Sequence, residues 1–352
     1  MHEPDLRVYS SDMELIGFVS GITSLQWHRK FNEPGEFELH VALTEEATSY
    51  LQMENLLWIP GKSEAGVIEF REPERDADFS DFTVKGRFLS SYLDRRLIRP
   101  YYSIDNGLVE TAMREIFSNA VALPRVTLGP ELGITDKVTF QATYKNLLTW
   151  EEKLAQYADI GLRFRPDFDA KTITFELYKG VDRSTSQTDR AQVIFSEEYG
   201  NILKADYEED STTYKNVCYV GGQGEGTART FVTVGDDTLT GLKRREMLLD
   251  ATDVEKEKLT DSQYQAALKQ RGVDKLKSEA CMTDSLDAEI EPTSNYTYPD
   301  DYDLGDIVTI SIPSWGVSVD RRITEINEIY ENGAYKIEPT FGTRATISFS
   351  DN

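Results

Sequence analysis

The sequence predicts a predominantly β chain of the α+β class, with two antiparallel β-barrel-like modules that carry α+β and helical insertions. Three observations support this fold class. Short runs with apolar residues at alternate positions recur in residues 5–88 and again beyond residue 190, which is typical of half-buried strands. Two stretches between them have the helical period instead. The length of 352 residues is enough for about two domains of roughly 150 residues each.

The clearest strand pair lies in residues 24–41, SLQWHRKFNEPGEFELHV. Apolar side chains occupy alternate positions on both sides of a polar turn. A register with Phe31 opposite Phe37 and Trp27 opposite Val41 directs both apolar sets to one core. We expect the following side chains to hold the first module together: Trp27, Phe31, Phe37 and Leu39.

The same register places Lys30 opposite Glu38 and His28 opposite His40 on the wet face of the hairpin. Two imidazoles could share a metal ion. A zinc site needs three or four protein ligands, however, and the sequence places no third ligand nearby. We therefore expect an exposed cross-strand histidine pair and no metal site.

Changes of pattern divide the chain into modules and insertions. A helical piece interrupts the first module after Thr44, a good N-cap. The boundaries that we expect are 1–95 for the first β-barrel module, 96–185 for the α+β insert, 186–240 with 283–352 for the second β-barrel module, and 241–282 for the helical insertion.

Within the insertions, residues 106–121 and 145–161 have helical patterns, and the second helix has a plausible stop at Gly161. The Ser- and Thr-rich stretch 181–190 is the best linker candidate. Residues 248–280 suggest a helix, a turn and a longer helix.

The two β modules share an architecture that suggests a distant duplication, but no repeat of residues is visible. In the second module we expect Tyr302, Leu304 and the strand from Ile307 to form the core. A further strand is expected at residues 345–350.

The net charge of −24 argues against a protein that grips a nucleic acid duplex, since such a surface repels phosphates. It suits a wall past which DNA slides without sticking. No apolar run approaches 18 residues and no export signal is visible, so we expect no membrane span. Cys218 and Cys281 lack C-x-x-C spacing, which favours synthesis in a reducing cytoplasm.

Two further motifs have structural explanations. The acidic stretch 300–308, DDYDLGDIV, fails the spacing of a calcium loop and fits a tight turn before a strand. The glycines of residues 221–226 precede a strand and not a helix, which favours a hairpin tip over a phosphate site. No nucleophile or metalloprotease motif is present. We predict no catalytic, cofactor-binding or metal-binding residue and no cofactor.

Several segments together resemble phage tail-hub proteins, and more narrowly the siphophage baseplate-hub family related to the central hub of T-even phages. The resemblance spans nearly the whole chain. The segments that carry it are WHRKFNEPGEFELHV, AGVIEFRE, FTVKGRFLSSYLDRRLIRP, VIFSEEYGNI, YVGGQGEGTAR, YDLGDIVTI and RRITEINEIYE.

This resemblance implies a structural hub of a tail tip or baseplate that acts by assembly and not as an enzyme. Its implied partners are two further copies in a ring around the tail channel, the distal tail protein, the tape-measure protein and tip or receptor-binding proteins. DNA would pass without specific binding. The implied location is the tail of a virion or of a prophage-derived particle, after synthesis in the bacterial cytoplasm.

Two other functions stay open from the sequence. One is a tail-associated cell-wall hydrolase, because an acidic β protein can supply a carboxylate pair. The other is a host-glycan-binding module, because the chain contains many tyrosines. Hub relatives can carry an enzyme in a C-terminal extension, and we expect none here because the second module would close near Asn352.

Overall fold

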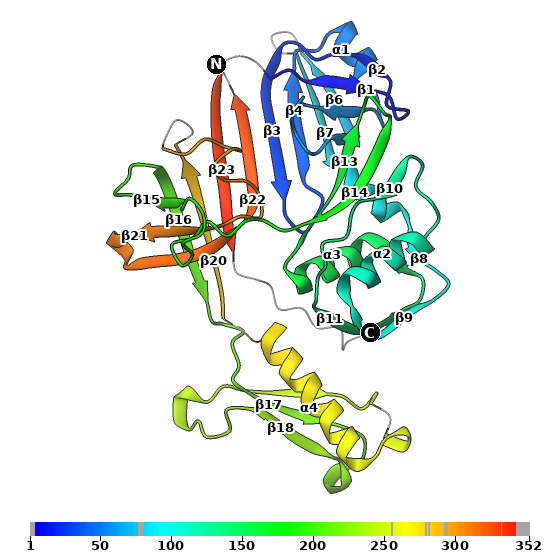
Figure 1. The fold of residues 1–352 in the computed structure, drawn as a ribbon, viewed down its shortest axis with the longest axis vertical. Coiled ribbons are helices and arrows are strands. Elements are labelled where there is room, and N and C mark those ends of the chain that lie inside the picture. The colour runs from blue at the N-terminus through cyan, green and yellow to red at the C-terminus, as the bar shows by residue number, and fades with distance from the viewer. Residues whose placement is uncertain are drawn as a thin grey trace. The chain divides into compact units, whose positions relative to one another are not determined.

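The structure is a computed structural model. It forms two compact units, of which unit 1 contains Met1–Tyr207 and Leu286–Thr343 and unit 2 is built on Glu208–Ser285 (Figure 1). The residues that it describes are 4–76, 80–254, 256–278, 280, 282–291, 295–331 and 333–342. The strand predicted at residues 345–350 and Cys281 lie outside them.

Unit 1 is dominated by one thirteen-stranded sheet, which confirms the predominantly β prediction. Most neighbouring strands run antiparallel. The strands of the first module are β1 (Arg7–Tyr9), β2 (Leu15–Phe18), β3 (Ile22–Lys30), β4 (Glu36–Val41), β5 (Leu56–Trp58), β6 (Gly66–Arg75) and β7 (Ser80–Phe88). The strands of the second module are β15 (Ile194–Ser196), β16 (Ile202–Asp210), β20 (Thr283–Ile290), β21 (Ile307–Ile312), β22 (Val317–Glu331) and β23 (Ala334–Gly342). A 3-10 turn, η5 (Pro313–Trp315), joins β21 to β22.

The two modules repeat the same strand order. The first runs β3-β4-β7-β6-β5-β1 and the second runs β16-β20-β23-β22-β21-β15. One pairing differs in direction, because β1 is antiparallel to β5 whereas β15 is parallel to β21. The modules join edge to edge, since β22 also pairs with β3. The repeat that is invisible in the residues is therefore visible in the topology.

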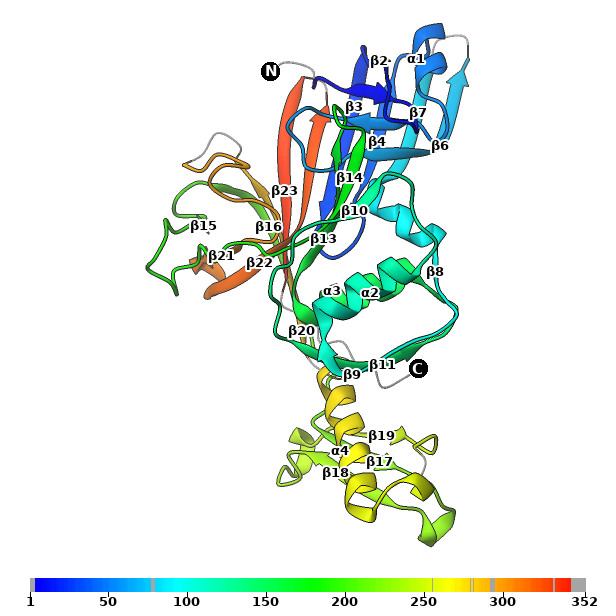
Figure 2. The ribbon, with the colours of Figure 1, turned by 45° about the vertical axis from the view of Figure 1, so that its right-hand side comes forward.

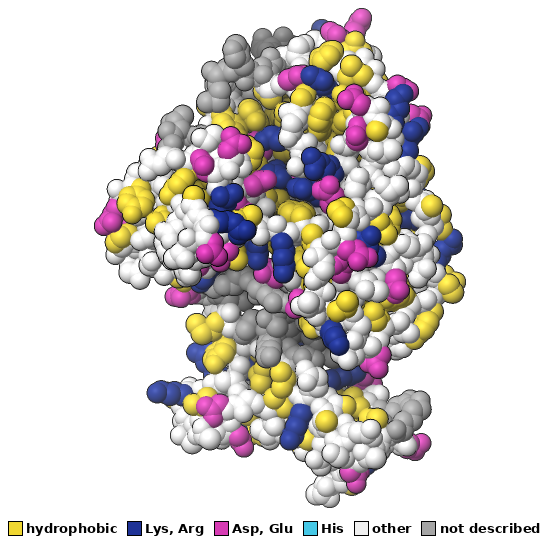
Figure 3. All heavy atoms as spheres, viewed as in Figure 1, with side chains coloured by type: hydrophobic (Ala, Val, Ile, Leu, Met, Phe, Trp, Pro, Cys, Tyr) yellow, Lys and Arg dark blue, Asp and Glu magenta, His cyan; other side chains and the backbone are white. Residues whose placement is uncertain are grey.

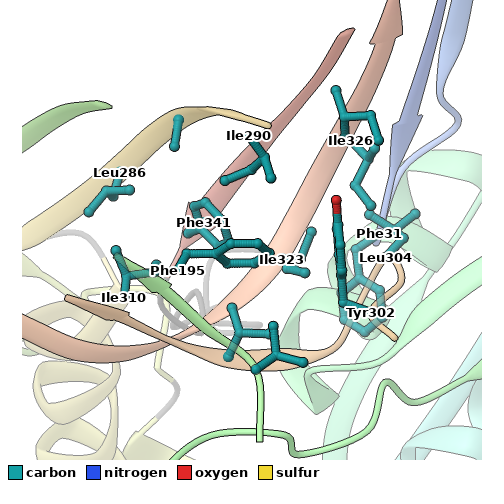
Figure 4. Packing of buried hydrophobic residues seen from close by; sticks show 14 of the residues in the cluster. Phe31, Phe195, Leu286, Ile290, Tyr302, Leu304, Ile310, Ile323, Ile326 and Phe341 are labelled. Carbon is teal, nitrogen blue, oxygen red and sulfur yellow. The ribbon is translucent and has the colours of Figure 1, made fainter. Parts of the chain in front are cut away.

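Each module has its own apolar core. Trp27, Phe37 and Leu39 lie in the first core, as predicted. Phe31 does not, because it packs in the second core beside Tyr302 and Leu304 (Figure 4). The predicted core residues of the second module are confirmed, with Tyr302, Leu304, Val308, Ile310 and Ile312 all buried.

The predicted hairpin register is wrong. Trp27 pairs with Phe37 and not Val41, and His28 pairs with Glu36 and not His40. The cause is Phe31, whose backbone N–H donates to Thr324 at 2.9 Å while its carbonyl accepts from the Leu162 N–H at 3.1 Å. The strand therefore ends at Lys30, the connection to β4 is longer than predicted, and every pair shifts.

The first module also contains α1 (Glu45–Tyr50), where Thr44 Oγ1 accepts from the Ala47 N–H at 3.0 Å and confirms the predicted N-cap. The predicted helices of the insert are present as α2 and α3. Asp159, in the left-handed conformation with φ 54°, ends α3 in place of Gly161. The elements of the insert are η1 (Leu89–Arg95), β8 (Leu97–Ile98), β9 (Tyr102–Leu108), α2 (Val109–Asn119), β10 (Val126–Leu128), β11 (Lys137–Ala142), β12 (Lys145–Asn146), α3 (Leu147–Ala158), β13 (Gly161–Asp167) and β14 (Thr172–Tyr178).

Residues 181–190 are not a free linker. Asp182 forms a parallel bridge with Ile307, the Arg183 guanidinium lies 2.9 Å from Asp306, and the Thr185 N–H donates to Thr309 Oγ1 at 2.8 Å. The polar side chains that suggested a linker are instead the groups that bind this segment to β21.

Unit 2 is a small sheet with the order β18-β17-β19 and with α4 packed on β17 and β18 (Figure 2). Two predictions fail here. The predicted strands that correspond to β17 and β18 form this separate sheet and not part of the second module. Residues 248–250, predicted as the start of a helix, belong to the strand β19. The elements are β17 (Val217–Gly221), η2 (Gly226–Ala228), β18 (Phe231–Gly235), η3 (Gly241–Lys243), β19 (Glu246–Asp250), η4 (Lys256–Lys258) and α4 (Asp261–Ser278).

The core of unit 2 lies between α4 and the sheet. Tyr264 and Leu268 of α4 are buried against Cys218 and Val220 of β17. Among the described helices, none is long and apolar enough to cross a membrane.

Candidate functional site: the charged face of the sheet

The wet face of the sheet in unit 1 has two hollows at equivalent places in the two modules. The first hollow, of about 390 Å³, is lined by β3, β4, β6 and β7. The second, of about 350 Å³, is lined by their counterparts β16, β20, β22 and β23. The charged residues of the first hollow other than His28 are Glu36, Glu38, Glu69, Lys85 and Arg87. Those of the second are Lys204, Asp206, Asp287, Glu289, Glu325 and Glu338.

Carboxylates outnumber basic side chains across the two hollows, so this face repels polyanions. Part of the acidic charge is neutralised locally, because Lys85 lies 2.8 Å from Glu38 and Arg87 lies 2.8 Å from Glu69. Figure 3 shows another side of unit 1, where acidic and basic side chains lie next to each other.

His28 lies between the two hollows and lines both of them. Its Nε2 is 2.5 Å from Glu325 of β22, and its Nδ1 is 3.7 Å from Glu36 of β4. The hydrogen bond with His28 lowers the pKa of Glu325. This histidine therefore connects the two modules on the wet face, where the sequence predicted a second histidine as its neighbour.

His40 has different partners from those predicted. Its Nδ1 lies 2.8 Å from Asp81 and its Nε2 lies 3.0 Å from Glu38. Burial opposes the charged form, but the hydrogen bonds to Asp81 and Glu38 outweigh it and raise the pKa of His40. Within the described part of the chain, no group of three or more His, Cys, Asp or Glu side chains is arranged for a metal ion.

The buried side of the same junction contains an ionic network. Arg29 of β3 is 3% exposed and forms two hydrogen bonds of 2.9 Å with Glu64. It also donates to Tyr298 at 2.7 Å and to Asp303 at 2.6 Å. Burial disfavours the charged guanidinium, yet Glu64 leads the interactions that hold the pKa of Arg29 well above its ordinary value. Arg29 thus connects the first module with the segment before β21.

The network continues to Glu328 of β22, which is fully buried. Lys62 donates to Glu328 at 2.6 Å, and the Tyr298 and Tyr335 hydroxyls donate at 3.1 and 2.8 Å. Paired and hydrogen-bonded in this way, the buried charges are tolerated. This network was not predicted. The signal for it in the sequence is Arg29, a charged residue at an alternate position between the apolar Trp27 and Phe31.

The other candidate motifs have ordinary structural partners. Asp303 pairs with Arg29, and Asp306 pairs with Arg183 and accepts from the Val181 N–H at 2.6 Å. The acidic stretch is therefore a tight turn before β21. The glycine-rich residues 221–226 connect the antiparallel β17 and β18, as predicted for a hairpin tip.

Two carboxylates of α3 were not singled out by the sequence. Both Glu151 oxygens are buried without a hydrogen-bond partner, and burial raises the pKa of Glu151 well above its ordinary value. Burial, followed by the charges of Glu33 and Asp94, raises the pKa of Glu152 to about 7. Neither side chain lines one of the two hollows.

The fold is shared with solved phage tail proteins. A tail protein from Neisseria meningitidis has a TM-score of 0.62 at 13% identity, covering 99% of both chains. The 43 kDa tail protein of prophage MuSo2 from Shewanella oneidensis has a TM-score of 0.62 at 11% identity, covering 96% of this chain and 98% of its own. Prophage tail protein gp18 from Listeria monocytogenes has a TM-score of 0.55 at 14% identity, covering 96% and 94%.

No curated protein sequence is detectably similar to this chain. A family model does match, and it covers residues 5–343. The predicted resemblance to phage tail-hub proteins is confirmed. The chain belongs to the family of Siphovirus ReqiPepy6 Gp37-like proteins.

Proposed function

We propose that this protein is a structural hub of a phage tail tip or baseplate, in which three copies form a ring around the tail channel. The observation that carries the proposal is the repeated module. Two modules of the same strand order joined edge to edge supply two sixths of a ring, so three chains complete a pseudo-six-fold closed assembly.

The charged face described above would line the channel. Each module contributes one hollow at the equivalent place, as expected for a wall built from repeated modules. Its excess of carboxylates would keep DNA from adhering during passage. The role is one of assembly and passage, without catalysis. The neighbours in the tail would be the distal tail protein, the tape-measure protein and tip or receptor-binding proteins.

Solution mass and imaging test this proposal. Size-exclusion chromatography with light scattering should give three times the mass of the chain at high protein concentration. Single-particle imaging of that species should show a central hole lined by Glu325 and Glu338 from the second hollow and Glu38 from the first. A particle without a hole, or a hole lined by the opposite face, would contradict the assignment.

A further inference from the structure

The repeated strand order identifies one strand edge that has a partner in the second module but none among the described strands in the first. In β6 the pairing with β7 shifts register between Ile68 and Phe70. In β22 the pairing with β23 shifts between Ile323 and Glu325. The two irregularities occupy the same place in the repeat, so the part of β6 after Phe70 corresponds to the part of β22 after Glu325.

Beyond the irregularity, β22 has neighbours on both sides. It pairs with β23 on one edge and with β3 on the other, from Glu325 opposite Lys30 to Glu331 opposite Ser24. The corresponding part of β6, residues 70–75, pairs with β7 on one edge. On its other edge, β5 pairs no further along β6 than Val67, and no other described strand follows.

The strand that would complete the repeat is the counterpart of β3, which is β16. β16 ends the sheet at the opposite side from β6, beyond β20 (Figures 1 and 2). Each free edge exposes a large apolar side chain, with Phe70 43% exposed on β6 and Leu203 55% exposed on β16. Free edges with exposed apolar residues are templates for pairing with another chain.

We propose that β16 of one copy pairs with residues 70–75 of β6 in the next copy, and so repeats between chains the junction that β3 and β22 form within one chain. The proposal rests on the proposed ring. It uses two different surfaces of the same chain, which is the head-to-tail contact that a closed ring requires. It names the strands that meet at the ring interface.

The first hollow would then be completed by the neighbouring copy. Within the chain, His28 of β3 contacts Glu325 on the neighbouring strand β22 and lines the second hollow. In the ring, the wet-face side chains of β16 in the neighbouring copy, Lys204 and Asp206, would lie beside the outer half of β6. Pro73 lacks an N–H group on β6, but Pro339 is accommodated between strands in the interior of the same sheet.

Hydrogen exchange of the full chain tests the pairing without assuming a register. On going from dilute monomer to concentrated trimer, those amides in residues 70–75 and 202–206 that face the new partner should exchange at least tenfold more slowly, because they gain hydrogen bonds. The edge strand β2 has no counterpart in the repeat and should be unchanged. Slowing confined to β2 or to other segments would overturn the proposal and leave the ring intact.

A matched pair of variants gives a second readout. Leu203→Lys on β16 should weaken trimer formation at least tenfold, whereas Phe18→Lys on β2, where Phe18 is also 55% exposed, should leave it unchanged. Both variants should melt like the unchanged protein as monomers, since both positions are exposed. Equal weakening by the two variants, or none by Leu203→Lys, would overturn the proposal. Failure of the unchanged protein to form a trimer would instead refute the ring itself, and this pairing with it.

Discussion

The two β modules of unit 1 have the same strand order but differ in how their edges are used. In the second module, β22 is flanked by β23 and β3 along its outer half. In the first, the equivalent half of β6 has β7 on one side only within the described strands. The second module also carries unit 2 between β16 and β20, where the first has a short connection from β3 to β4.

This difference distinguishes the strand pairings that each module needs in order to fold from the strand edges that are open for assembly. The shared order β3-β4-β7-β6-β5-β1 surrounds a core in each module, so each module can bury its own apolar residues. The junction of β3 with β22 then makes the two modules one continuous sheet. Edges that the repeat leaves open are the places where another chain can extend it.

Matched core truncations in the two modules give the largest expected effects. Trp27→Ala in the first core and Phe195→Ala in the second should each lower the free energy of unfolding by about 3–5 kcal/mol, because each side chain is fully buried. If the junction couples the modules, thermal melting should show one shifted transition in both variants. Trp315→Ala, at a 48% exposed position, is the control. Full stability of Trp27→Ala would refute the core assignment.

The ionic network tests the junction itself. Arg29→Met leaves Glu64 buried without its cation and should cost about 3–5 kcal/mol of stability in denaturant unfolding. The double variant Arg29→Met/Glu64→Leu should recover much of this loss, because no unpaired buried charge remains. Asp303, whose side chain is 39% exposed, can be solvated instead. A double variant as unstable as the single one would show that the penalty has another origin.

Glu151 offers a stabilising change in the insert. Glu151→Met should raise the free energy of unfolding by about 1–3 kcal/mol, because a buried carboxyl without hydrogen bonds is removed. Burial raises the pKa of Glu151 above the ordinary 4.5, so the folded chain keeps a proton that the unfolded chain releases. Stability of the unchanged protein should therefore fall as the pH rises above 4.5. Glu151→Gln should remove the contribution of Glu151 to this slope and leave that of Glu152, whose pKa is also raised. A less stable Met variant would contradict the assignment.

The pH dependence due to His40 is the smallest expected effect. It is confined to the first module, because all three histidines of the chain, at positions 2, 28 and 40, lie in that part of the sequence. The pKa of His40 is raised from 6.5. Its stabilisation is fully present below pH 6.5 and is lost as the pH rises through the raised value. Between pH 6 and pH 8, the contribution of His40 to the free energy of unfolding in denaturant should change by less than about 1 kcal/mol. The variant His40→Gln should lack this contribution. An unchanged pH dependence in that variant would argue against the ion pairs.

Local patterns were sufficient to predict much of the fold. The alternating residues of β22 and β23 predict their extents, and the helical periods predict α2 and α3. The strand β19 was predicted as part of a helix, because its apolar run is short and is flanked by charged residues. Its partner strand, β17, also lies far earlier in the chain. Short strands with distant partners carry little local signal.

The candidate site was less predictable because its contacts are non-local. The partners of Arg29 are Glu64, Tyr298 and Asp303, none of them near it in sequence. Phe31 has the parity of the first core but belongs to the second, since the chain leaves the strand at Lys30. A single departure of this kind changed the register, and with it the predicted histidine pair.

The long strand β22 has a mechanical consequence. It spans Val317–Glu331, and its first half pairs with β21 whereas its second half pairs with β3. A force along the strand direction would load the hydrogen bonds of the β3–β22 ladder together in shear, whereas a force across the sheet would break them one after another. The connection between the modules is therefore strongest against tension along the strands and weakest against peeling.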